Sequence, residues 1–142
     1  MSGAGIIRAS WVGTIAFALA TVAGVVAPSA LAWVGFGVSL ALFVVGCAVF
    51  VWAFALAVAR SRTDEIAVSN LYLLSGAPTQ VRTQLFGSLA VEVVVAFGTA
   101  AARPYTIAAT AILAPVYALG LCGLWSARHG TFPPRRPAPK RK

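Results

Sequence analysis

The stretch QLFGSLAVEVVVAFGTAAA, residues 84–102, decides how the rest of the chain is interpreted. It is apolar and long enough to cross a bilayer, because a spanning helix needs roughly 20 apolar residues. One carboxylate, Glu92, lies near its middle, where a charged side chain costs ~2.5–3.5 kcal/mol on insertion scales. The sequence therefore predicts a membrane helix that carries an ionisable group at its centre.

The composition extends this prediction to the whole chain. Of the 142 residues, 60% are hydrophobic and only 10% are charged, and the mean hydropathy is +0.89, whereas a soluble domain carries about 25% charged residues. Residues 9–59 contain no charged side chain, which leaves room for two spans. We therefore expect an all-α polytopic membrane protein, with a four-helix transmembrane domain over residues 1–127 that is built from two helical hairpins.

The expected spans cover about residues 11–27, 31–59, 84–102 and 105–126. Residues 28–29 (Pro-Ser) indicate a tight turn in the first hairpin. An alternative remains open, because Arg8, an apolar run and the Ala-Leu-Ala of residues 30–32 are also typical of a signal peptide with an A-x-A cleavage site. Cleavage would leave three spans, but the strongly apolar residues that follow favour the uncleaved hairpin.

The connection between the second and third spans has the features of a short helix over about residues 64–75. Ser61 and Asp64 have the spacing of a capping box, and Gly76 followed by Pro78 is typical of a helix end. Apolar side chains recur on one face, so we expect the helix to lie at the membrane surface. It either packs on its own bundle as a lid or docks a partner protein.

The C-terminal residues 128–142 are expected to form a disordered tail. Its prolines favour extended structure, and its basic residues should be attracted to anionic lipid headgroups. The predicted membrane-surface residues are Arg135, Arg136, Lys140, Arg141 and Lys142. We expect no nucleic-acid partner, because the net charge of +8 comes from basic residues at the ends of the spans.

The basic residues also predict the orientation of the chain. Ten of the eleven Lys and Arg side chains fall on the side that holds both termini, and only Arg103 falls on the other side. The positive-inside rule then places the N- and C-termini in the cytoplasm.

The sequence lacks the usual catalytic and metal-binding patterns. It has no HExxH motif and no Gly-rich phosphate loop after a strand, and Cys47 and Cys122 do not form a CxxC pair. His129 lies at the edge of the predicted membrane region without partners for a catalytic triad. We therefore expect no enzyme activity, no cofactor and no metal site, and a lipid-modifying enzyme ranks third among the functions considered.

Glu92 is the candidate site, because no basic residue can pair with it directly. Arg82 and Arg103 are ten and eleven residues away on the same helix, or ~15 Å in each direction. A carboxyl group in a medium of low dielectric constant tends to stay protonated. The sequence therefore predicts a neutral acid that needs a hydrogen-bond partner.

The second hairpin suggests where that partner lies. If the last two spans turn at residues 103–104, Glu92 is level with residues near Pro115. Pro115 has no N–H, so the carbonyl of Ala111 loses its helical donor, and in lipid such a group must be satisfied internally. We expect Glu92 to hydrogen-bond to this region, at Ala111, Pro115 or Tyr117.

The second half of the chain resembles a group of small uncharacterised membrane proteins from actinobacteria. The resemblance covers about residues 60–136 and is carried by SNLYLLSGAPTQVRTQLFGSLAVEVVVAFGTA (residues 69–100) and LGLCGLWSARHGTFPPR (residues 119–135). It implies four spans and a bacterial plasma membrane, and it implies no activity or binding residue.

These observations favour a non-catalytic structural or accessory subunit that acts through helix packing, with a membrane-protein partner or as a homo-oligomer. The alternative is a minimal proton- or cation-coupled transporter or channel subunit that uses Glu92.

Overall fold

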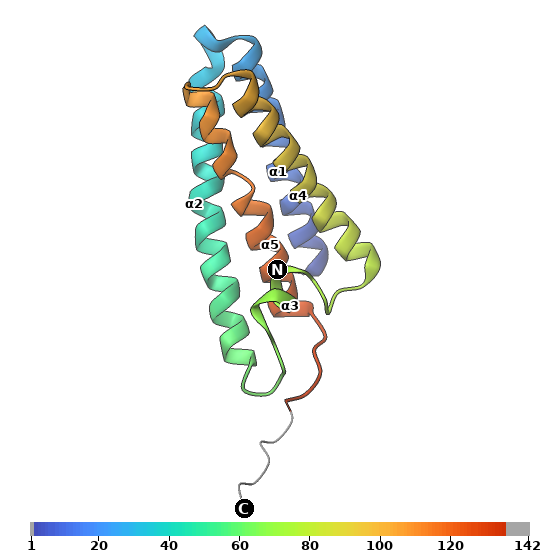
Figure 1. Ribbon diagram of the computed structural model, residues 1–142. Helices are drawn as coiled ribbons and strands as arrows, with labels where there is room; N and C mark the ends of the chain where they lie inside the picture. The colour runs from blue at the N-terminus through green and yellow to red at the C-terminus, as the bar shows by residue number, and fades with distance from the viewer. Residues whose placement is uncertain (1, 136–142) are drawn as a thin grey trace, which may run out of the picture.

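Long apolar helices dominate the protein, as the ribbon in Figure 1 shows. The computed structural model describes residues 2–135. In this part of the chain, four segments are long and apolar enough to cross a membrane: α1 (Gly3–Val26), α2 (Pro28–Arg60), α4 (Thr79–Ala102) and the segment Ile107–His129. The all-α, four-span prediction is confirmed.

The first two helices begin earlier than the hydropathy pattern predicts, because residues suited to a helix start precede the apolar runs. Ser2 caps α1, and its Oγ accepts a hydrogen bond of 3.2 Å from the N–H of Gly5. Pro28 opens α2, where its missing N–H costs nothing in the first turn. With 33 residues, α2 is ~50 Å long and exceeds the ~30 Å hydrocarbon core of a bilayer.

The fourth span is divided into two helices, whereas the sequence suggested one helix over residues 105–126. A 3₁₀ helix, η1 (Ile107–Leu113), precedes α5 (Val116–His129). Pro115 cannot donate to the carbonyl of Ala111, but the tighter 3₁₀ winding lets the N–H of Ala114 donate to that carbonyl at 3.1 Å. The predicted vacancy is therefore filled by the backbone itself.

The two hairpins also pack against each other. α1 packs against α2 and α4 packs against η1, as consecutive spans, and in addition α5 packs extensively against α2 and α4 packs against α1. Figure 1 shows α4 diverging from α5 towards the end of the bundle where α1 begins and α5 ends, which we name the basal end. At the α2–α5 crossing the backbones nearly touch, since a Cβ atom on Gly46 would lie 2.6 Å from the nitrogen of Tyr117.

The connection at the basal end forms a lid on its own bundle. Its helix, α3 (Val68–Tyr72), is shorter than the predicted helix. Leu71 and Leu74 are fully buried, and the ring of Tyr72 stacks on Phe50 with centroids 4.3 Å apart. The Tyr72 hydroxyl donates to the Phe50 carbonyl at 3.0 Å, so the apolar side of this connection is already occupied by the bundle.

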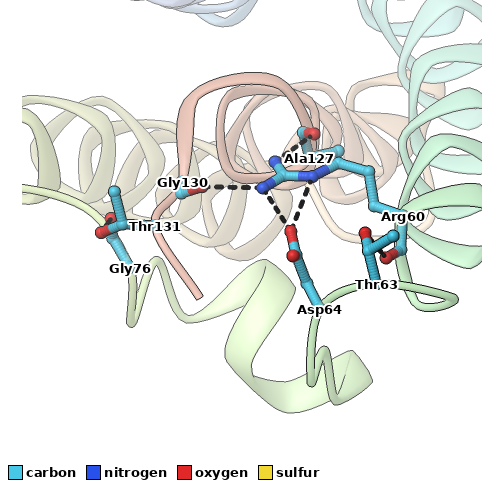
Figure 2. Close-up of polar contacts among 7 residues, drawn as sticks. All are labelled: Arg60, Thr63, Asp64, Gly76, Ala127, Gly130 and Thr131. Atoms are coloured by element: carbon cyan, nitrogen blue, oxygen red, sulfur yellow. Dashed lines mark hydrogen bonds and ion pairs between the residues drawn. The ribbon is translucent and has the colours of Figure 1, made fainter. Parts of the chain in front are cut away.

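Asp64 does not form the predicted helix cap, because it pairs with Arg60. The guanidinium of Arg60 contacts the Asp64 carboxylate at 2.8 Å and donates to the carbonyls of Ala127, at 2.8 Å, and Gly130, at 3.2 Å. Figure 2 shows Arg60 between the lid and the end of α5. One arginine thus joins α2, the lid and the C-terminal residues.

The first part of the predicted disordered tail is ordered. α5 continues to His129, and residues 130–135 run along the lid. The N–H of Glu65 donates to the Pro133 carbonyl at 2.8 Å, and the N–H of Arg135 donates to the Thr63 carbonyl at 2.9 Å. The other predicted surface residues, Arg136, Lys140, Arg141 and Lys142, lie outside the described residues.

Candidate functional site

A polar seam joins α1 and α4, which run in the same direction. Ser10 hydrogen-bonds to Ser88 and Thr14 to Glu92, and each pair is separated by 78 residues. The same separation recurs at the far end, where the Arg103 guanidinium donates to the Val25 carbonyl at 3.1 Å. A constant separation means that the two helices keep one register along their length.

Glu92 lies at the centre of this seam and is fully buried. Its Oε1 is 2.9 Å from the Thr14 hydroxyl oxygen. The same hydroxyl oxygen is 2.9 Å from the carbonyl oxygen of Ser10, one turn earlier on α1. Thr14 therefore contacts two oxygen atoms at equal distances.

These two contacts constrain the protons, because a hydroxyl has one hydrogen to donate. The hydrogen can be donated to the Glu92 carboxyl group, and the Ser10 carbonyl then keeps its helical hydrogen bond from the Thr14 N–H. It can also be donated to the Ser10 carbonyl, and the contact with Glu92 is then a hydrogen bond only if the carboxyl group donates its own proton to the Thr14 oxygen. Both contacts are satisfied together when Glu92 is a neutral acid.

Donor and acceptor can be assigned in the same way for the two serines of the seam, Ser10 and Ser88. The Ser88 hydroxyl donates to the carbonyl of Leu85 at 2.9 Å, so the Ser10 hydroxyl is the donor in the contact between the two serines. Each hydroxyl of the seam then has one acceptor. A satisfied network of this kind fixes the relative position of two helices.

The second carboxyl oxygen of Glu92 is less well satisfied. Oε2 forms no hydrogen bond with any residue from 2 to 135. The backbone N–H of Ala118 lies near the carboxyl group, in the first turn of α5, where amide groups lack a partner within the helix. The break in the fourth span thus brings a helix N-terminus close to Glu92.

Apolar side chains enclose the carboxyl group along the seam. One turn towards the far end lie Phe17 and Ala96, and one turn beyond the serines towards the basal end lie Ile6 and Leu85. All four are fully buried. Glu92 therefore occupies a polar layer between two apolar layers.

The predicted partners of Glu92 lie close to it but bond elsewhere. The Tyr117 hydroxyl donates to the carbonyl of Ala9 at 2.8 Å, and the carbonyl of Ala111 accepts from Ala114. Ala118, which is next to Tyr117, lies near the carboxyl group. The side chain that bonds Glu92 comes from α1, because α1 also packs against α4.

The sequence does contain a signal for this pairing. Ser10, Thr14 and Thr21 are separated by four and seven residues, and Ser88, Glu92 and Thr99 repeat the same intervals. Residues four and seven apart share one face of a helix. Two apolar helices with identical polar spacing can therefore be aligned without a structure.

The remaining candidates do not gather around Glu92. Arg135 lies at the basal end, where its guanidinium donates to the carbonyl of Ser61 at 2.9 Å. Cys47 and Cys122 are free thiols. Within residues 2–135, no group of three His, Cys, Asp or Glu side chains is placed to hold a metal ion.

The fold and the seam define a small multi-pass helical membrane protein. Comparisons with protein-family models, with curated protein sequences and with solved structures give no match. What the protein does must therefore be argued from its own residues.

Proposed function

We propose that the protein is a non-catalytic structural or accessory subunit of a bacterial plasma membrane. The α1–α4 seam gives the bundle one fixed shape, and the outer surface of that shape packs against a membrane-protein partner or further copies of the chain. The observation that supports this proposal is the pair of contacts made by the Thr14 hydroxyl. Both are hydrogen bonds at the same time when Glu92 is a neutral acid and donates its proton.

The alternative protonation state would weaken the seam. An ionised Glu92 would attract the Thr14 hydrogen, and the Ser10 carbonyl would keep its helical hydrogen bond from the Thr14 N–H. The ionised form would also hold a charge between apolar layers, where the insertion cost is ~2.5–3.5 kcal/mol. The neutral acid avoids the cost of this charge and joins the two helices.

α2 is the proposed contact surface. It is the least buried of the four spans, and its outer face carries large exposed apolar side chains. They include Val34, Leu40, Val44, Val45, Val51 and Trp52. Lipid can cover such a face, but a partner helix can pack against it equally well.

Basic side chains support a cytoplasmic basal end. Arg8 lies near the start of α1, Arg62 follows the end of α2 and Arg128 is in the last turn of α5, so all three are at the basal end, whereas Arg103 follows the other end of α4. The positive-inside rule favours this orientation. The lid and residues 130–135 then face the cytoplasm.

Affinity purification in a gentle detergent, followed by mass spectrometry, tests the proposal. We expect a stoichiometric partner or a discrete homo-oligomer. A Val44→Trp variant should lose it, because the added ring enlarges the exposed face of α2. The matched control is Val94→Trp, since Val94 is exposed on α4. Recovery of monomer alone from the unmodified protein would contradict the proposal.

A proton- or cation-coupled transporter is the second candidate. The unpartnered Oε2 and the nearby start of α5 favour it, because transporters often place broken helices around a binding site at the middle of the membrane. In proteoliposomes, Glu92→Gln should then abolish uptake while leaving the fold intact. The enclosing apolar layers are the reason that we place this candidate second.

A further inference from the structure

Two tryptophans on α2 indicate where the bilayer lies. Trp33 and Trp52 are both exposed and are 19 residues apart, which corresponds to ~28 Å along a helix. This distance matches the ~30 Å hydrocarbon core, and tryptophan is enriched at both membrane interfaces. The two rings therefore mark the two interfaces.

Contacts between helices show which residues of α5 and α1 lie at the same depth as the two tryptophans. The Arg128 guanidinium lies 4.8 Å from the centre of the Trp52 ring, so the last turn of α5 is at the basal interface. Gly35 packs against Thr21, which places Thr14 and Glu92 ~13 Å from the level of Trp33. Glu92 is thus near the middle of the membrane.

A cavity of about 570 Å³ opens at this basal interface. It lies between the end of α5 and the residues that lead into α4. Trp125 and His129 form one wall, with their rings 5.7 Å apart, and Ser75, residues 76–78 and Thr131 form the other. The cavity therefore combines an imidazole, two hydroxyls and an indole at the depth of lipid headgroups.

We propose that this cavity binds the headgroup of an anionic phospholipid. Its phosphodiester accepts hydrogen bonds, and the lining contains two groups that can supply them, the imidazole of His129 and the indole N–H of Trp125, which has no partner among residues 2–135. The helices that flank the cavity add basic residues at this end of the bundle, Arg82 on α4 and Arg128 on α5, although neither side chain lines the cavity. Positive charge at a membrane surface attracts anionic headgroups.

The position of the cavity favours a lipid over a soluble ligand. Its wall residue Trp125 is 94% buried within the membrane-spanning part of α5, whereas His129 is exposed at the interface. A ligand here meets an apolar side chain and a polar group one helical turn apart. A phospholipid has this arrangement of chemistry, with acyl chains below its phosphate.

Native mass spectrometry of the delipidated full-length protein tests the site. Phosphatidylglycerol and phosphatidylcholine would be titrated in the same detergent. Glycerol phosphate would be added as a soluble competitor that has the headgroup chemistry without acyl chains. We expect phosphatidylglycerol to bind preferentially and glycerol phosphate not to compete. Ser75→Glu adds a negative charge to the cavity and should weaken phosphatidylglycerol binding about tenfold.

The matched control is Ser69→Glu, because Ser69 is exposed on the same lid but does not line the cavity. It should change the affinity less than about twofold. His129→Leu provides a second variant at the site and should also weaken binding. If Ser69→Glu and Ser75→Glu lost the same affinity for phosphatidylglycerol, general surface charge would explain the effect and the proposal would be overturned. Equal affinity of the unmodified protein for both lipids would also overturn it.

Discussion

Removing the Thr14 hydroxyl and the Glu92 carboxyl group, separately and together, measures the hydrogen bond that holds the seam. Thr14→Val keeps the shape of the side chain, and Glu92→Leu replaces the acid with an apolar group. The two groups are 2.9 Å apart and fully buried. Hydrogen bonds between membrane helices contribute ~0.6 kcal/mol on average and up to ~1.7 kcal/mol, so we expect a coupling of about 1 kcal/mol.

The assay is the free energy of unfolding, obtained by titrating the protein in mild detergent with sodium dodecyl sulfate. Glu92→Gln is informative alongside the cycle, because its amide keeps an N–H donor for the Thr14 oxygen. It should cost less than ~1 kcal/mol, whereas Thr14→Val leaves the carboxyl group without a partner and should cost ~1–3 kcal/mol.

The chain supplies a matched control pair. Thr21 and Thr99 occupy the same register on α1 and α4, but their hydroxyls donate to Phe17 and Val95, carbonyls of their own helices. Replacing both by valine should therefore give additive effects, within ~0.3–0.5 kcal/mol. Additive effects at Thr14 and Glu92 as well would refute the hydrogen bond, and a coupling of about 1.5–3 kcal/mol would indicate an ionised acceptor.

Three further predictions follow from the packing. Gly46→Ala should destabilise the protein by more than ~1 kcal/mol, because its Cβ would meet the backbone of α5, whereas Gly37→Ala should be tolerated because nothing lies within 4 Å. Arg60→Ala should release residues 130–135, and limited proteolysis should then cut there faster than in the unmodified protein. Burial raises the pKa of Tyr72 above its ordinary value, which favours the neutral phenol in the folded state. Stability should therefore fall as the pH rises above ~10, and Tyr72→Phe should make this fall smaller.

Hydropathy alone was sufficient for the four spans, because apolar length and the lack of charge over residues 9–59 leave few other structures. It could not identify which helices are neighbours. Pairing of consecutive spans predicts a partner of Glu92 on the last span, which α4 does contact, but the bonded hydroxyl of Thr14 comes from α1, which also packs against α4. The repeated four- and seven-residue intervals of the polar side chains carry the missing information.

The hydrogen bonds that satisfy individual backbone and side-chain groups are harder to predict from the sequence. The missing N–H of Pro115 was evident from the sequence, but whether a side chain or a 3₁₀ turn would satisfy Ala111 depends on the competing energies of both. The sequence favours a helix cap at Asp64, because the residues that compete for it, Arg60 and the C-terminal segment, come together only in the folded chain.

Infrared difference spectroscopy at neutral pH tests the central claim most directly. Subtracting the spectrum of Glu92→Gln from that of the unmodified protein isolates the vibrations of this one side chain. We predict the carbonyl stretch of a protonated carboxylic acid, moved to higher frequency in Thr14→Val because a hydrogen bond is lost. A difference spectrum that contains only carboxylate bands would contradict the claim that Glu92 is a neutral donor between α1 and α4.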